Sequence, residues 1–386
     1  MTHQPMPREQ ALSLVRQLLD TAFRRDHERV ASFYAADAVA VSPVFGEVRG
    51  RDAVAATWRT LFTTFSDLAI ENVDYLVDGD RVAVLGKIST TDRIGWFGQA
   101  PTGSPITYRL VLLFTVIDGL IVHDERIYDS AGIVERLEKA RLDKEMRTAS
   151  DVQQALLPRT DHVGRFYESV GDSVPCRAIG GDFFELMELP SGDVGILMGD
   201  VAGKGPAAAL LAALLQGMFA VEAPAAGSPA LTLSRINRRL AARGIGPRFA
   251  TLVYGVLSPD GRFTYSNAGH NAPVLAARAG VRRLDTGGPL LGAFPDAAFD
   301  EETLQLEAQD TLVMFTDGVT EARNPGDEEF GDDRLIERVM ANAACPPLEL
   351  MRSVFEAVHD FCRGTDQGDD ITVTVSRFTD SPRSTS

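Results

Sequence analysis

Residues 194–221 read VGILMGDVAGKGPAAALLAALLQGMFAV, and this stretch decides the fold of the C-terminal half of the chain. An apolar run ends at Asp200, glycines open a turn, and Pro206 starts an Ala-rich apolar segment. Glycine permits a tight turn, and proline suits the first position of a helix. We therefore predict a buried strand that delivers a carboxylate to a sheet edge, followed by a buried helix over 207–221. That helix is too short, and its side chains are too small, for a membrane span.

Three further segments of this half place aspartate beside glycine or at the end of an apolar run. They are IGGDFFE at 179–185, FTDG at 315–318 and GDDIT at 368–372. A single Asp-Gly pair is usually a turn, but gathered carboxylates repel one another unless a cation neutralises them. Oxygen ligands without Cys or His nearby select hard ions such as Mg²⁺ or Mn²⁺. Two such ions can orient a water molecule for attack on phosphorus, so the sequence favours a two-ion hydrolytic site.

The first 130 residues show a different pattern, in which helices precede a series of strands. Apolar residues recur at helical spacing from Leu12 to Ala22, a short helix is predicted to carry Phe33 and Tyr34, and a third helix is predicted over 50–65. Extended segments, with Asp-Gly turns between several of them, are predicted at 38–42, 74–77, 81–89, 108–116 and 120–128. This order predicts an α+β unit in which one curved sheet wraps on helices.

Residues 133–158 join the two halves and contain no glycine, with proline only at the last position. This composition predicts a long helix. Leu142, Ala149 and Leu156 recur every seven residues, which fits either a solvated connecting helix or a dimerising coiled coil. We therefore divide the chain into a first domain at 1–132, a helical linker at 133–158, a second domain at 159–378 and a flexible tail at 379–386.

The amino-acid composition limits the binding partners and the cellular compartment that we expect for this protein. The 386 residues include 38 basic and 54 acidic side chains, which gives a formal net charge of −16. A chain this acidic is not expected to bind nucleic acid or an anionic membrane surface. Its three cysteines show no metal-finger or disulfide spacing, and the first ten residues lack the apolar core of a secretory signal. We therefore expect a cytoplasmic protein.

The stretch from Val152 to Phe378 resembles the SpoIIE/RsbU-type bacterial serine/threonine phosphatases, a branch of the metal-dependent PPM phosphatases. The motifs that carry the resemblance occur in the family's order: QALLP at 154–158, GGDFF at 180–184, MGDVAGKGPAAALLAALLQG at 198–217, FATLVYG at 249–255, SNAGHNAPVL at 266–275, VMFTDGVTEARN at 313–324 and GDDITV at 368–373. The resemblance implies an α-β-β-α sandwich with the metals at one end. Two residues depart from the family pattern: Glu185 stands where aspartate is usual, and Ala178 stands where an acidic residue is common.

The resemblance also implies roles for individual residues. Asp200 would bridge two Mn²⁺ or Mg²⁺ ions, and Asp200 and Asp317 would be catalytic through metal-bound water. The implied metal ligands are Asp182, Asp200, the Val201 carbonyl, Asp317 and Asp369, and the implied surrounding residues are Asp370, His270 and Lys204. His270 is either a general acid toward the leaving oxygen or a structural turn residue, and Lys204 either attracts phosphate or is only solvated.

The first domain resembles the SnoaL-like branch of the nuclear transport factor 2-like superfamily. The matching stretches are RVASFYAADAVAVSP at 29–43, GRDAVAATWRTLF at 50–62 and VHDERIYDSAGIVERL at 122–137. The resemblance implies a cone-shaped domain whose curved sheet encloses an apolar pocket, lined by Trp96, Tyr108, Tyr128 and Asp129. Such a domain senses a small ligand, mediates dimerisation, or acts as an enzyme through Asp129 with His123 nearby.

Together these patterns predict a metal-dependent protein serine/threonine phosphatase that the N-terminal domain regulates. By resemblance, its substrate is a phosphorylated STAS-type anti-sigma factor antagonist in a partner-switching pathway, and the protein is a homodimer. The alternative is that the SnoaL-like domain carries the main activity, as a small-molecule binder or an isomerase or cyclase, while the phosphatase unit is an inactive scaffold.

Overall fold

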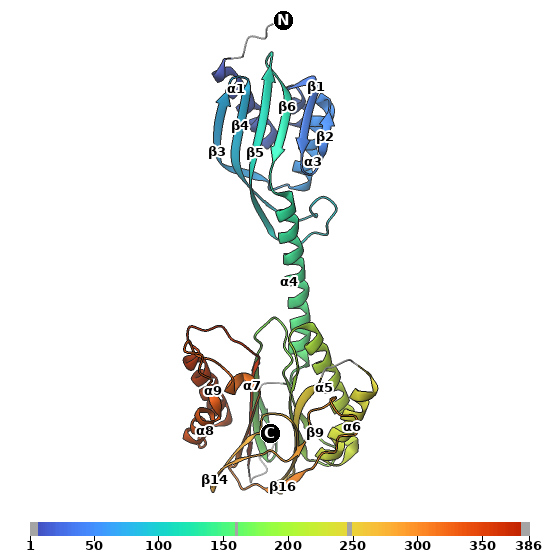
Figure 1. The fold of residues 1–386 in the computed structure, drawn as a ribbon, viewed down its shortest axis with the longest axis vertical. Helices are drawn as coiled ribbons and strands as arrows, with labels where there is room; N and C mark the ends of the chain where they lie inside the picture. Colours follow the sequence, from blue (N-terminus) through green and yellow to red (C-terminus); the bar gives the residue numbers. More distant parts are fainter. Residues whose placement is uncertain (1–6, 159–160, 245–248, 380–386) are drawn as a thin grey trace. The chain divides into compact units, whose positions relative to one another are not determined.

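The computed structural model describes residues 7–158, 161–244 and 249–379. The chain divides into two compact units, residues 1–145 and 146–386, and the division falls inside helix α4 (Ser130–Leu156) (Figure 1). This helix is the one predicted over 133–158. Of the tail predicted at 379–386, only Thr379 lies within the described residues.

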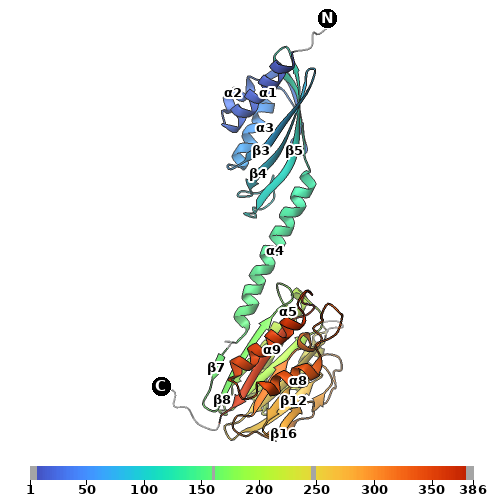
Figure 2. The ribbon, with the colours of Figure 1, turned by 90° about the vertical axis from the view of Figure 1, so that its left-hand side faces the viewer.

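The first unit contains one six-stranded sheet in the order β2-β1-β6-β5-β4-β3. Helices α1 (Arg8–Phe23), α2 (His27–Ala31) and α3 (Arg51–Thr64) all lie against one face of this sheet (Figure 2). The strands are β1 (Tyr34–Ser42), β2 (Gly46–Arg49), β3 (Ala69–Asp78), β4 (Arg81–Thr91), β5 (Pro105–Ile117) and β6 (Leu120–Ile127). The Asp118-Gly119 pair has positive φ at both residues, as a tight hairpin between β5 and β6 requires. The predicted α+β class is therefore confirmed.

The short helix of this unit differs from its predicted position. Helix α2 ends at Ala31, and Tyr34 begins strand β1. The fully buried Tyr34 hydroxyl donates to Asp124 of the neighbouring strand β6, at 2.8 Å. This long-range contact outweighs the local helical pattern, so the prediction of Phe33 and Tyr34 in a helix was wrong.

The second unit is a sandwich of two six-stranded sheets with helices on both outer faces (Figure 1). The first sheet contains β9 (Phe183–Glu188), β10 (Val194–Val201), β11 (Ala250–Leu257), β12 (Arg262–Ala268), β15 (Gly287–Gly288) and β16 (Glu302–Gln305). The second contains β7 (Asp161–Val163), β8 (Tyr167–Val174), β13 (Val274–Ala277), β14 (Gly280–Arg283), β17 (Thr311–Phe315) and β18 (Ile371–Phe378).

Three apolar clusters hold the layers of this sandwich together. One lies between the sheets, a second joins helices α5 (Pro206–Ala226) and α6 (Pro229–Ala242) to the first sheet, and a third joins α8 (Gly331–Ala341) and α9 (Pro347–Phe361) to the second. Burying apolar surface on both faces of each sheet is what stabilises a four-layer arrangement. The predicted α-β-β-α architecture is the observed one.

Helix α5 was predicted as a buried helix over 207–221 and is the observed helix after β10. Among the described helices it alone has the length and apolar composition of a membrane span, but half of that apolar window is buried inside the unit. Leu211, Leu215 and Phe219 pack against the first sheet, and the Phe219 ring meets Tyr254 edge-on at 4.8 Å. The helix therefore serves as a core helix of this unit.

Candidate metal centre

Four acidic loops of the second unit meet at one end of the sandwich. Asp200 lies near the end of β10, and Asp182 directly precedes β9 in the same sheet. Asp317 follows β17 and opens the short helix α7 (Asp317–Thr320), and Asp369 comes shortly before β18. Because the two sheets face each other, strands from both deliver carboxylates to the same edge.

The electrostatics of these carboxylates show that they are close together. Burial, followed by the charges of Asp317 and Asp369, raises the pKa of Asp200 to about 6. Burial and the charge of Asp200 raise the pKa of Asp182 well above its usual range. Burial and the charge of Asp369 raise the pKa of Asp317. Ionisation of Asp182, Asp200 and Asp317 is thus opposed by burial and by the neighbouring carboxylates, and a bound cation would offset this repulsion.

Asp182 is the most enclosed of the four, with 6% of its surface exposed. Its Oδ2 accepts hydrogen bonds from the hydroxyls of Thr316, at 2.7 Å, and Thr372, at 2.6 Å. Both hydroxyls favour the ionised carboxylate and so oppose the effect of burial. Sequence reasoning missed these two threonines, although each stands inside an acidic motif, FTDG and GDDIT.

The Val201 carbonyl lies beside the loop that carries Asp182. A Cβ atom on Gly181 would sit 2.8 Å from the Val201 carbonyl oxygen and 3.2 Å from Asp200 Oδ1. A side chain at this position would fill the space, so only glycine lets the loop approach the end of β10. The predicted oxygen ligands Asp182, Asp200 and Val201 are thereby brought together.

Asp370 and Asp369 are neighbours in sequence but differ in their surroundings. The Asp370 carboxylate is buried and accepts backbone N–H groups of Cys176 and Gly181, each at 2.8 Å. It therefore holds the loop before β9. Asp369 is more exposed, and Lys204 Nζ lies 2.9 Å from its Oδ2. The sequence predicted that Lys204 either attracts phosphate or is only solvated. The structure instead shows it in an ion pair with Asp369.

Cys176 is a neighbour of this centre that sequence reasoning did not connect with it. Its sulfur lies within 4.8 Å of carboxylate oxygens of Asp369 and Asp370. Burial and the hydrogen bond with Asp370 raise the pKa of the thiol to about 11. Burial thus disfavours the thiolate, and sulfur is in any case a weaker ligand than carboxylate oxygen for a hard cation.

The donor set fits a hard divalent cation. Apart from this thiol, the groups that converge are carboxylate, carbonyl and hydroxyl oxygens, the ligands that Mg²⁺ and Mn²⁺ prefer. Lys204 is the only basic side chain that the structure pairs with one of these carboxylates among the described residues, so most of the negative charge stays uncompensated. A divalent ion would supply the missing positive charge.

Each half of the chain matches a known protein family. Residues 190–379 match the family model described as stage II sporulation protein E (SpoIIE), and residues 15–124 match the SnoaL-like domain. The chain combines a SpoIIE-type PPM phosphatase domain with an N-terminal SnoaL-like domain. The family resemblance expected from the sequence is therefore confirmed.

Curated relatives share the SpoIIE-type domain at moderate identity. Protein IcfG of Synechocystis sp. is 27% identical over 258 residues, which cover 59% of this chain and 40% of that protein. The phosphoserine phosphatase RsbU of Bacillus subtilis is 28% identical over 221 residues, which cover 55% of this chain and 64% of RsbU. The chain thus spans less than two thirds of the length of each of these relatives.

Solved structures share the fold of the SpoIIE-type domain. The SiaA-PP2C domain of Pseudomonas aeruginosa aligns with a TM-score of 0.55 at 19% identity, over 62% of this chain and 98% of that one. The RsbU and RsbW domains of Rv1364c from Mycobacterium tuberculosis align with a TM-score of 0.51 at 23% identity, over 58% and 63% of the two chains. These similarities show a PP2C-like sandwich.

His270 of the SpoIIE-type domain occupies a buried turn. Its backbone N–H donates to Asn267 Oδ1 at 2.7 Å, and its Nδ1 pairs with Thr251 Oγ1 at 2.8 Å. Burial lowers the pKa of the imidazole to about 4. The ring is therefore neutral at pH 7 and holds no extra proton to donate, which favours the structural role over the general acid.

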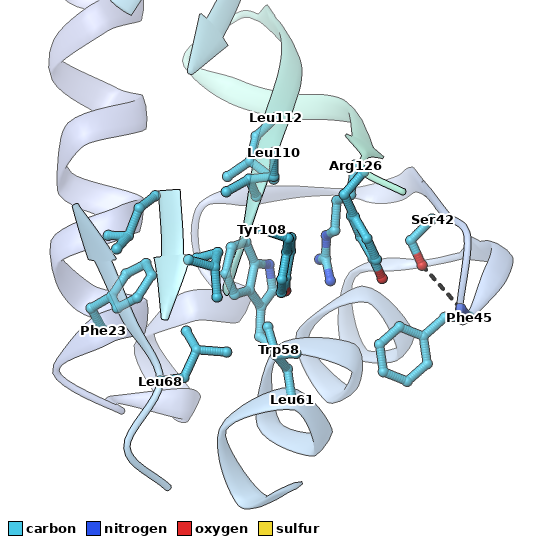
Figure 3. Close-up of a pocket in the computed structure, with 13 residues that line it drawn as sticks. Phe23, Ser42, Phe45, Trp58, Leu61, Leu68, Tyr108, Leu110, Leu112 and Arg126 are labelled. Carbon is cyan, nitrogen blue, oxygen red and sulfur yellow. Dashed lines mark hydrogen bonds between the residues drawn. The ribbon is translucent and has the colours of Figure 1, made fainter. Parts of the chain in front are cut away.

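The SnoaL-like domain contains a cavity between α3 and the inner face of its sheet (Figure 3). Tyr108 and Tyr128 line it, as predicted, but the structure places Trp96 and Asp129 outside it. Trp96 packs edge-on against Tyr108 with 6.1 Å between ring centroids, within the core. Asp129 accepts the backbone N–H of Gly132, so it stabilises the first turn of α4.

His123, considered as a partner for Asp129, does not line the cavity either. It is partly exposed and lies 3.9 Å from Glu125 on the same strand. The acidic residue that sequence reasoning missed is Asp124, which is fully buried beside Arg126 at 2.9 Å. Side chains alternate between the two faces of strand β6, and this places Asp124 and Arg126 on the inner face. The neighbouring residues His123 and Glu125 are also polar, so the sequence alone does not indicate which of the four are buried.

Proposed function

We propose that this protein is a metal-dependent phosphatase that hydrolyses phosphoserine or phosphothreonine on a protein. The observation that carries the proposal is the convergence of Asp182, Asp200, Asp317 and Asp369, whose mutual repulsion calls for bound cations. The SpoIIE family match and the name of the relative RsbU, a phosphoserine phosphatase, support the same reaction.

The residues divide into two groups around the ions that they would hold. Asp200, the Val201 carbonyl and Asp182 would serve one Mn²⁺ or Mg²⁺ ion, and Asp317 and Asp369 would serve a second. Bound ions of this kind supply a Lewis acid for the phosphoryl oxygens and a water molecule of lowered pKa. The protein contributes the rigid strand ends that hold the carboxylates in place, and two threonine hydroxyls whose hydrogen bonds favour the ionised form of Asp182.

Lys204 forms an ion pair with Asp369, at the edge of the acidic cluster. Its Nζ pairs with the same carboxylate that would bind the second ion. If Asp369 held an ion, the Lys204 ammonium at the edge of the centre would be available to attract a phosphate group.

For the substrate we propose a phosphorylated STAS-type anti-sigma factor antagonist. RsbU and RsbP of Bacillus subtilis, both named phosphoserine phosphatases, are 28% and 25% identical to this chain over the matched regions. A protein substrate suits an acidic chain, for which nucleic acid is an unfavourable partner. The protein would then act in cytoplasmic signal transduction by partner switching, which regulates a sigma factor.

We propose that the SnoaL-like domain regulates the centre through α4, and that α4 mediates a homodimer. Leu142, Val152 and Leu156 of α4 are each at least half exposed, which is unusual for large apolar side chains. A second copy of the same helix would cover them in a short coiled coil. Light scattering of the full chain tests the dimer, and Leu142→Lys with Leu156→Lys should yield a monomer.

The central experiment measures Mn²⁺-dependent release of phosphate from a phosphoserine protein. Asp200→Asn and Asp317→Asn should each lower turnover by roughly a thousandfold or more, since each removes a charge that the ions need. Asp296→Asn, a change of the same chemistry at an exposed loop position, should leave turnover unchanged. Full activity in either centre variant would remove the proposed mechanism.

The alternative is an inactive phosphatase unit beside an active SnoaL-like domain. Such a scaffold is expected to have lost part of its ligand set, whereas every carboxylate of the centre is present. In the SnoaL-like domain, neither Asp129 nor His123 reaches the cavity. Calorimetric titration with Mn²⁺ separates the two functions, because a scaffold would bind no ion.

A further inference from the structure

The solvent-facing side of helix α5 is apolar. This helix lies beside α6 on the outer face of the first sheet of the SpoIIE-type domain (Figure 1). The structure describes all 21 residues of α5, and none of its exposed positions carries a charged or polar side chain. Leu210 and Val221 are 73% and 68% exposed. An outer helix of a globular protein ordinarily places charged residues on this side, so the exposed side of α5 is suited to contact with another molecule.

A groove of about 570 Å³ runs between this side of α5 and α6. Leu214, Gly217 and Val221 line it from α5, and Ala242 lines it from α6. Leu210 lies four residues before Leu214, which places it on the same face of α5 and extends the apolar stripe along the helix. A groove bordered by a stripe of this spacing accepts the apolar face of another helix.

One rim of the groove is basic. Arg239 of α6 and Arg243, directly after the end of α6, line it, and Arg235 lies one turn before Arg239. Arg235 and Arg239 both pair with the buried carboxylate of Glu222, at 3.6 and 2.6 Å. Among the residues that the structure describes, Arg243 has no acidic partner. Three guanidinium groups are thus accompanied by one carboxylate, so positive charge is in excess at this rim.

The charge of the rim determines which kind of partner fits. A partner that covered the groove would remove water from the arginines, and a buried charge without a counter-charge is costly. The partner must therefore bring carboxylates beside its apolar side chains, because carboxylates form charge-assisted hydrogen bonds with guanidinium groups. The net charge of the whole chain is −16, but repulsion from its distant carboxylates is screened beyond about 8 Å at physiological ionic strength.

A second copy of this chain and a membrane fit the same surface less well. Glu222 is the only acidic residue of α5 and α6, and it is already paired. A symmetric contact between two copies of these helices therefore supplies no carboxylate for either basic rim. A bilayer surface is flat, whereas the residues of α5 and α6 form a groove, and an anionic bilayer repels a chain of this net charge.

We propose that the groove between α5 and α6 is a docking site for a partner protein, and that it binds an amphipathic helix whose apolar face is flanked by glutamate or aspartate. The apolar side chains of that helix would pack on Leu214 and Val221, and its carboxylates would pair with Arg239 and Arg243. This inference goes beyond the proposed phosphatase reaction and does not depend on it, because such binding needs neither a metal ion nor a phosphate group.

The test titrates the full-length chain into a fluorescently labelled synthetic peptide and follows fluorescence anisotropy at about 0.15 M salt. The peptide has about 16 residues, long enough to form a helix, with leucine at i, i+3, i+4 and i+7 and glutamate on both flanks. The control peptide contains the same leucines and glutamates in an order that distributes leucine around the helix. We expect the amphipathic peptide to bind with a Kd of about 10 μM, about tenfold more tightly than the control peptide.

Variants of exposed groove residues connect binding to the named contacts. Val221→Glu places a charge in the apolar stripe and Arg243→Glu reverses a charge of the rim, so each should weaken peptide binding about tenfold. Met340→Glu on α8 and Arg352→Glu on α9 make the same changes at exposed positions outside the groove and should leave the affinity unchanged. The thermal midpoint of each variant is measured alongside. If Val221→Glu is less stable than the unmodified protein, Arg243→Glu and its control decide the outcome.

Several results would overturn the proposal. They are no binding of the amphipathic peptide at about 1 mM, equal affinity for the control peptide, or the same loss of affinity in the groove variants and in their controls. Light scattering and sedimentation with vesicles of phosphatidylcholine and phosphatidylglycerol test the other two occupants. If the peptide does not bind, a dimer that Val221→Glu converts to a monomer would show a self-contact, and vesicle binding that Val221→Glu abolishes would show a membrane surface.

Mn²⁺-dependent phosphate release is measured on the same preparations, so that this inference and the proposed phosphatase can fail separately. Turnover without peptide binding removes this inference only. Peptide binding without turnover removes the proposed phosphatase only.

Discussion

The side-chain amide of Gln153, near the end of α4, makes two hydrogen bonds with the backbone of Gly180. Its Nε2 donates to the Gly180 carbonyl at 2.7 Å, and its Oε1 accepts the Gly180 N–H at 3.1 Å. Gly180 lies two residues before Asp182, so the helix holds one side of the loop that carries Asp182. Any movement of this end of α4 would therefore change the position of Asp182.

Replacement of Gln153 should weaken the centre without unfolding the domain. Gln153→Ala removes both hydrogen bonds and leaves the loop free to adopt other conformations, so Mn²⁺ affinity and turnover should each fall about tenfold. Calorimetric titration and phosphate release measure the two effects. Gln154→Ala, at the exposed neighbouring position, is the control and should match the unmodified protein. Equal Mn²⁺ affinity in both variants would contradict the positioning role.

The two neighbouring aspartates should respond differently to the same substitution. Asp369→Asn should lower Mn²⁺ affinity and turnover by about a hundredfold with little change in thermal midpoint, since its ion pair with Lys204 is partly exposed. Asp370→Asn should lower the stability of the domain by about 1–3 kcal/mol, because an amide cannot accept both backbone N–H groups. Scanning calorimetry and Mn²⁺ titration distinguish the two, and the reverse pattern would show that their roles are exchanged.

His270 should make the SpoIIE-type domain less stable as the pH falls. Its folded pKa of about 4 lies below the usual 6.5, so below pH 6.5 the unfolded chain binds a proton that the folded chain does not. The stability present above pH 6.5 is therefore lost progressively toward pH 4, by about 2 kcal/mol at pH 5. In urea unfolding, His270→Gln should remove this part of the pH dependence.

An exposed histidine provides the control for this effect. His359→Gln, on the solvent side of α9, should keep the full pH dependence of the unmodified protein. If His270 were the general acid, its replacement would instead remove a limb of the pH profile of turnover. Such a change, together with an unaltered stability profile, would refute the structural role.

Arg126 should be essential to the stability of the SnoaL-like domain. The Asp124 carboxylate is fully buried and accepts from Arg126 and Tyr34, whose hydroxyl in turn accepts from Trp58 Nε1 at 2.9 Å. Arg126→Met leaves that carboxylate without its counter-charge and should cost about 3–5 kcal/mol. Tryptophan fluorescence during urea unfolding measures the loss in this domain.

Two further variants test whether the loss comes from the unpaired charge. Asp124→Leu combined with Arg126→Met should recover part of the stability, since it removes both charges. Arg93→Met breaks a mostly exposed pair with Asp67 and should change the unfolding free energy by less than about 0.5 kcal/mol. A loss of similar size in Arg93→Met and Arg126→Met would contradict the explanation.

The parts of the fold that sequence patterns predicted well are those whose structure depends on local periodicity. Strand β10, helix α5, the α4 helix and the Asp118-Gly119 turn all follow from apolar spacing and glycine within a few residues. The short strands β13 to β16 were not predicted. They contain between two and four residues each, too few to show a period.

The sequence alone determined which acidic side chains stand at the ends of apolar runs, and so which residues are candidates for a metal centre. Only the tertiary structure decided what surrounds them. Thr316 and Thr372 reach Asp182 across 134 and 190 residues of sequence, and Gln153 reaches Gly180 across 27. The local pattern of apolar residues predicts whether a segment is buried. Which residues it contacts depends on how segments distant in sequence pack together.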